Sequence, residues 1–115
     1  MDRHARSVGV TIANGAALSE AFSMEAFSMG VVHMPAAWTA ASIGFKVAAT
    51  QGGTYLPLYD ESASLVQISG PAVDKAYVLP PAAAAMPWVK LWSQDGSGNN
   101  TNQGGDRTIT VTVKG

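Results

Sequence analysis

The sequence predicts an all-β domain, an antiparallel β-sandwich with a jelly-roll-like arrangement of about nine short strands. Apolar and polar residues alternate with the period of two that half-buried strands require, most clearly at Ile43, Phe45 and Val47. Turn signals such as Asn14-Gly15 separate these stretches at short, even intervals. No internal repeat of about 20 to 50 residues is present, so the pattern excludes solenoids and propellers.

The two ends of the chain carry matching alternation. Apolar residues fill every second position of residues 8–12 and of residues 109–113, and threonines stand between them in the second segment. We therefore expect the first and last strands to pair and close a sheet. The predicted core consists of inward-facing apolar residues: Val10, Ile12, Phe45, Val47, Val89, Leu91, Ile109, Val111 and Val113.

A five-residue duplication occupies residues 20–29, where Glu-Ala-Phe-Ser-Met occurs twice. On helical spacing, Phe22, Ala26 and Met29 would share a face, whereas on strand spacing Phe22 and Met24 would do so. The extended pattern that follows, which Pro35 ends, favours two strands with a turn between them.

The middle of the chain predicts short strands separated by turns. Residues 55–59 form a strand that Pro57 confines to a sheet edge or a bulge. Further strands are expected at residues 65–68, 76–79 and 88–92, with one helical turn at residues 82–86.

The composition indicates one domain with a partly covered surface. Of the 115 residues, 47% are apolar and only 13% are charged, about half the usual charged share. Either a partner covers part of the surface, or Ser, Thr, Asn and Gly keep it soluble. We expect an N-terminal arm at residues 1–6 and a single sandwich domain at residues 7–115.

The net charge, the length of the apolar runs and the lack of cysteine argue against several classes of function. The net charge of −1 gives no field that would attract nucleic acid, and no apolar run approaches the ~20 residues of a membrane span. The chain has no cysteine, which suits folding in a reducing cytoplasm and leaves no thiolate metal site. We expect neither a nucleic-acid partner nor a membrane partner.

Residues with catalytic potential are few and scattered, so no enzyme is predicted. His4 lies in the polar N-terminal segment, and His33 follows a strand without a nucleophile motif. Asp60 and Glu61 are adjacent and are read as turn residues rather than as a glycosidase pair.

The loop at residues 95–106 partly matches a calcium-binding loop. Asp95 stands at position 1, but Asn100 replaces the glycine required at position 6, and Asp106 replaces the glutamate at position 12. The sequence therefore favours a long hairpin loop, with no metal or cofactor site.

Two sets of residues are candidate partner contacts. Period 2 places Trp88, Lys90 and Trp92 on one face of their strand, which lies outside if the residues between them face the core. In the alternative arrangement, both faces of this strand are buried between layers. Arg3 and Arg6 make the N-terminal arm basic, and we expect this arm to be a contact element.

Three segments resemble a class of small tailed-phage proteins encoded with virion structural genes: residues 34–61, the Trp-Val-Lys-Leu segment at 88–91, and the ending at 103–111. The resemblance implies a virion protein, made in the host cytoplasm, whose partner is the major capsid protein or another virion structural protein. It also implies a homo-oligomer in the assembly.

Three functions follow from these observations. The first is a non-enzymatic capsid decoration protein that binds the capsid surface in many copies. The second is a tail or head-fibre subunit. The third is a carbohydrate-binding module of a phage adhesin, in which Trp88 and Trp92 would stack on sugars.

Overall fold

The computed structural model describes residues 5–115, which form nine strands and one short 3-10 helix. The helix, η1 (Pro81–Ala85), lies between the seventh and the eighth strand in the chain. The strands are β1 (Ala5–Ile12), β2 (Leu18–Ser23), β3 (Met29–His33), β4 (Ser42–Ala48), β5 (Leu56–Pro57), β6 (Gln67–Ile68), β7 (Ala76–Val78), β8 (Trp88–Gln94) and β9 (Arg107–Lys114).

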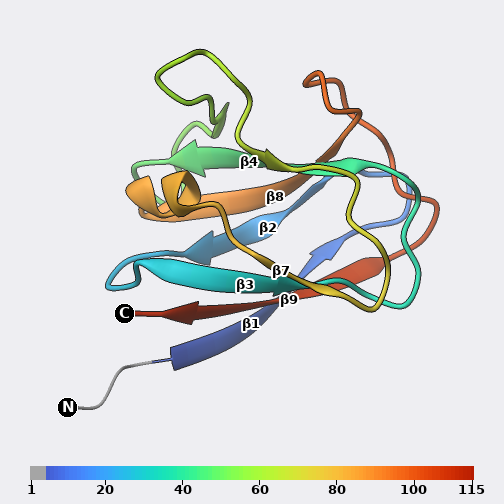
Figure 1. The fold of residues 1–115 in the computed structure, drawn as a ribbon, viewed down its shortest axis with the longest axis horizontal. Helices are drawn as coiled ribbons and strands as arrows, with labels where there is room; N and C mark the ends of the chain where they lie inside the picture. The colour runs from blue at the N-terminus through green and yellow to red at the C-terminus, as the bar shows by residue number, and fades with distance from the viewer. Residues whose placement is uncertain (1–4) are drawn as a thin grey trace.

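The strands form two antiparallel sheets that pack as a sandwich (Figure 1). One sheet has the order β1-β9-β3-β7, and the other has the order β2-β8-β4-β5, with β6 also paired to β4. The predicted β-sandwich is confirmed. Between β1 and β4 the chain changes sheet at every connection, so most neighbours within a sheet are far apart in sequence.

The expected pairing of the first and last strands is confirmed. β1 runs antiparallel to β9 from Ala5 opposite Lys114 to Ile12 opposite Arg107. The expected arm at residues 1–6 is wrong for Ala5 and Arg6, which pair with β9. The backbone of β9 continues to Lys114 and binds these two residues whatever their side chains. Residues 1–4, with His4 and Arg3, lie outside the described part of the chain.

The duplicated segment contains the end of β2, a turn and the first residue of β3, and its two copies occupy different environments. Phe22 and Met24, from the first copy, are buried in the core. In the second copy, Phe27 is half-buried and Met29 is 48% exposed. The turn between the copies includes Ala26, which has a positive φ of 66°. Equal sequences thus take unequal positions because the turn moves the chain from one sheet to the other.

The predicted core is also confirmed, since every residue named for it is buried in one continuous cluster. The cluster is completed by residues that the alternation pattern did not single out, including Val32, Leu79 and Ala83. Pro57 ends up on a two-residue strand at the sheet edge, where its missing N–H costs no ladder hydrogen bond.

Truncation of Phe45 to alanine should lower the free energy of unfolding by ~3–5 kcal/mol, because its side chain is fully buried in the cluster. Urea denaturation followed by circular dichroism measures this change. The matched control is Val78→Ala, at a side chain that is 74% exposed, where a change within about 0.5 kcal/mol is expected. Equal losses in the two variants would contradict the assignment of the core.

Candidate partner surfaces

The predicted face of β8 lies on the outer side of its sheet, opposite the core residues Val89 and Leu91. There the strand pairs with β4, so that Lys90 stands opposite Lys46 and Trp92 stands opposite Gly44. The period-2 argument thus placed Trp88, Lys90 and Trp92 on the correct side of the strand.

Trp92 is not the exposed anchor that the sequence predicted. Only 2% of this residue is exposed. Its ring lies over Gly44, where a Cβ would come 2.8 Å from Cε3 of Trp92. Its Nε1–H donates to Oδ1 of Asn100 over 2.7 Å, so the loop after β8 folds back against the ring. Gly44 leaves room for the Trp92 ring because it has no side chain, and the loop that contains Asn100 covers the ring from solvent.

The two lysines of this face are held by aromatic rings. Lys46 and Lys90 are opposite each other, an arrangement that repels because both carry positive charge. The ammonium of Lys46 lies 4.7 Å from the ring centroid of Trp92, and that of Lys90 lies 4.5 Å from the ring centroid of Tyr55. Each charge is thus compensated on a separate ring. The contact with Lys46 occupies ring surface of Trp92 that a sugar would need for stacking.

The loop at residues 95–106 uses its carboxylate internally. Asp95 accepts hydrogen bonds from the backbone N–H groups of Ser97 and Asn99, and also from the Asn99 side-chain amide. These bonds favour the charged form, led by the one from Ser97, and lower the pKa of Asp95. Within residues 5–115, no group of three or more His, Asp or Glu side chains is placed to hold a metal ion.

The buried amide of Gln103 ties the start of β9 to distant segments. Its Oε1 accepts from the backbone N–H of Thr39 and from Nε of Arg107, over 2.8 and 3.2 Å. Its Nε2 donates to the carbonyl of Thr39 and to Oγ of Ser93, over 3.0 and 2.9 Å. All four hydrogen-bonding positions of the amide are used. Two of the segments that carry the phage resemblance therefore meet at a structural contact.

The remaining candidates with catalytic potential are separated in space or already engaged. His33 is exposed at the end of β3. Asp60 accepts from the backbone N–H groups of Ser62 and Ser64, as expected of a turn residue. Arg6 and Trp88 line one pocket of about 180 Å³, so one arm residue and one residue of the predicted face do come together.

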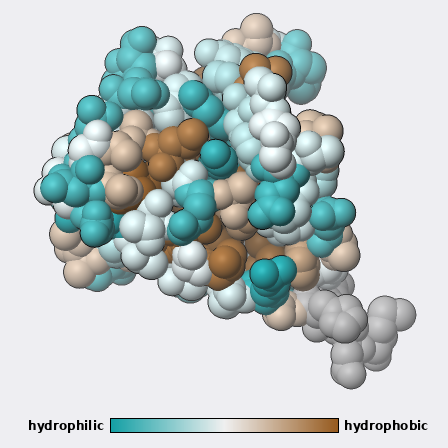
Figure 2. Space-filling view, turned by 180° about the vertical axis from the view of Figure 1, so that it is seen from behind, coloured by the Kyte–Doolittle hydropathy of each residue, from teal (hydrophilic) through white to brown (hydrophobic). Residues whose placement is uncertain are grey.

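A second surface is more apolar and was missed by the sequence analysis. Met29, Val31 and Val78 line a shallow groove of about 220 Å³ on the outer side of the other sheet, which we call the apolar groove. Met29 is 48% exposed and Val78 is 74% exposed. Its sequence signal is weak: Val31 alternates with Gly30 and Val32, so both faces of this strand are apolar. Apolar surface is also visible between polar groups in the view from behind (Figure 2).

The crystal structure of the SPBc2 prophage-derived protein YomS has the same fold. The two chains share 16% sequence identity with a TM-score of 0.55, and the alignment covers 97% of this chain and 96% of that one. No protein-family model and no curated protein matches the sequence. Among residues 5–115, no helix is long and apolar enough to cross a membrane.

Replacement of Trp92 by alanine should destabilise the fold by ~3–5 kcal/mol, because the ring is buried and the change leaves a cavity. The control is Trp88→Ala, at a half-buried position on the same strand, where a smaller loss is expected. Urea denaturation of both variants makes the comparison. Wild-type stability of the Trp92 variant would show that the ring is not packed as described.

The Asp95 loop should respond to acid. A lowered folded-state pKa means that the charged carboxylate stabilises the fold above the ordinary aspartate pKa of about 3.9, and that this contribution is lost as the pH falls. Asp95→Asn should therefore lower the melting temperature at neutral pH and cease to differ from wild type in strong acid. Melting curves across this pH range provide the test, and a difference that persists in acid would contradict it.

Proposed function

We propose that this chain is a non-enzymatic structural protein of a phage virion, most specifically a decoration subunit that binds the capsid surface in many copies. The observation that carries the proposal is the apolar groove. Exposed apolar surface rimmed by polar residues is typical of protein contact sites. Here it lies on a regular sheet, and Thr112 and Lys114 form part of its lining.

The fold comparison supports the phage part of the proposal. YomS, which shares this fold over nearly the whole of both chains, is prophage-derived. The resemblance of three segments to small virion proteins rests on sequence motifs, whereas this comparison rests on the fold. The two findings agree on the general class of protein.

The contacts of Trp92 favour a protein partner over a sugar ligand. In the carbohydrate-binding hypothesis Trp92 would need an open ring face, but it is buried under Lys46 and the loop that contains Asn100. The partner proposed for the apolar groove is the major capsid protein or another virion structural protein. Each contact is small, so repeated copies, associated with one another in the assembly, would add avidity.

Polar replacement of the groove residues should strongly weaken particle binding without unfolding the protein. A double variant, Met29→Ser with Val78→Ser, removes the two exposed side chains that line the groove most prominently. Loss of two contact anchors is expected to cost ~2–4 kcal/mol of binding, or at least about a thirtyfold loss of affinity. Binding is measured by sedimentation with purified particles that lack the protein.

The matched control is Val73→Ser, because Val73 is 40% exposed but does not line the groove. It should bind like wild type, and all variants should keep the wild-type melting temperature. Wild-type binding of the double variant would reject the groove as the contact. Electron microscopy of the decorated particles then locates the protein: density on the tail alone would replace the decoration role by that of a tail or fibre subunit.

A further inference from the structure

One long edge of the sandwich is open for hydrogen bonding. β1 is the end strand of its sheet, so only β9 pairs with it among the described residues. The N–H of Thr11 points away from β9, since it donates to Oε1 of Glu20 over 2.8 Å. Strand alternation directs the N–H groups of Ser7 and Gly9 to the same side. Glu20 covers the far end of this edge. On the side away from β9, no strand among residues 5–115 pairs with residues 5–9.

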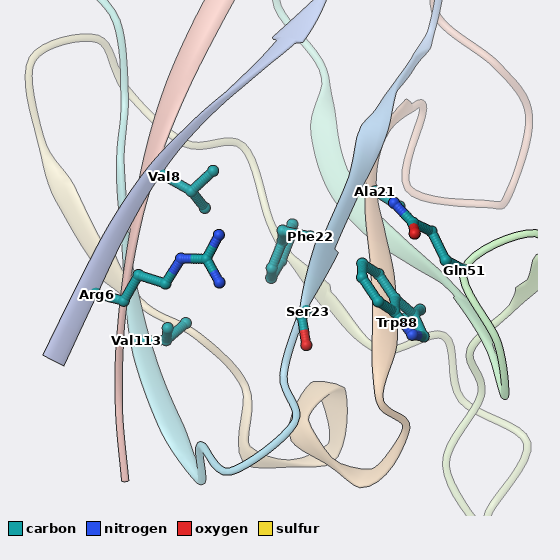
Figure 3. A pocket seen from close by; sticks show the side chains of 8 residues that line it. All are labelled: Arg6, Val8, Ala21, Phe22, Ser23, Gln51, Trp88 and Val113. Atoms are coloured by element: carbon teal, nitrogen blue, oxygen red, sulfur yellow. The ribbon is translucent and has the colours of Figure 1, made fainter. Parts of the chain in front are cut away.

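A pocket opens beside this free edge, where β1 and β2 separate. Arg6 and Val8 contribute from β1, Phe22 from β2, and the pocket holds about 180 Å³. In the close-up view, the guanidinium of Arg6 reaches from β1 across the gap toward Phe22 (Figure 3). Val113 and Trp88 complete the apolar part of the lining. The site combines unpaired backbone, a small pocket with both polar and apolar lining residues, and one positive charge.

We infer that residues 5–9 of β1 are a strand-addition site for an extended segment of another protein, one that carries an apolar side chain two residues from a carboxylate. An added strand obtains affinity from backbone hydrogen bonds and specificity from pockets for alternate side chains. Arg6 and Val8 are two positions apart and face the same side, so the partner residues opposite them are also two positions apart. The carboxylate pairs with Arg6, and the apolar side chain packs against Val8 and Phe22.

Charge decides between another protein and a second copy of this chain. β1 contains no acidic residue, and symmetric antiparallel pairing of two β1 strands about Ser7 would place the two Arg6 side chains as diagonal neighbours on one face. Like charges facing across strands are unfavourable. A charged side chain turned toward the interior also blocks unspecific edge pairing. Arg6 thus favours a partner strand with a carboxylate opposite it and disfavours strands without one.

This site does not depend on the assignment to a phage, and it shares no lining residue with the apolar groove. The probe is a synthetic peptide, TTLTETT, with both ends blocked. In antiparallel addition its leucine lies opposite Val8 and its glutamate opposite Arg6. The matched control peptide is TTLTKTT, in which lysine replaces glutamate. Each is titrated into ¹⁵N-labelled protein, and the backbone amide signals are followed by NMR.

We expect the amide signals of Ser7 and Gly9 to shift and saturate with the glutamate peptide, and the lysine peptide to bind about tenfold more weakly. Arg6→Gln should remove this difference between the peptides. Ser7→Pro should abolish binding of both, because it removes an outward N–H without removing a bond to β9. Unchanged melting temperatures will show that these variants remain folded.

Several results would overturn the inference. The first is equal affinity for the two peptides, and the second is a set of amide shifts confined to residues other than Ser7 and Gly9. The third is no shift at Ser7 and Gly9 at about 5 mM peptide, a concentration at which even weak strand pairing is detectable. Concentration-dependent shifts of the same two amides without peptide would instead show that a second copy of the chain occupies the edge.

Discussion

The pairing of β9 with β1 on one side and β3 on the other is the interaction on which the rest of the structure depends. β9 lies inside its sheet, and its three inward residues, Ile109, Val111 and Val113, are almost completely buried. The first and third strands therefore receive their positions from the last one. The free edge of β1 and the apolar groove beside β3 both exist because β9 holds these strands in place.

The buried amide of Gln103 extends this control to the other sheet. It binds Thr39, in the connection that precedes β4, and Ser93 on β8. A buried amide with all its bonds made is stabilising, whereas loss of one partner leaves a desolvated polar group. Gln103 and Thr39 belong to the segments that resemble small phage proteins. The resemblance is thus carried, at this point, by residues that hold the fold together.

The low charge of the chain has two structural explanations that act together. On the outer side of the β1-β9-β3-β7 sheet, hydroxyl groups bind one another across strands, as in Ser7 with Thr112 and Thr11 with Thr108. Hydroxyls keep this surface polar without formal charge. The neighbouring strands, β3 and β7, present the apolar groove instead. Hydroxyl residues and exposed apolar residues therefore occupy adjacent parts of one sheet.

The sequence by itself determined the fold class, the strands with clear alternation, the core and the pairing of the chain ends. Each of these follows from a local period of two, which is a property of neighbouring residues. The tertiary structure decided which outward-facing residues remain exposed. Trp92 has the outward position that its period predicts, yet Gly44 and the loop at Asn100 bury it, and these contacts come from other segments. Arg6 reads as part of an arm, but β9 provides it with a partner strand. Periodicity tells which way a side chain points, and only the packing of distant segments tells what covers it.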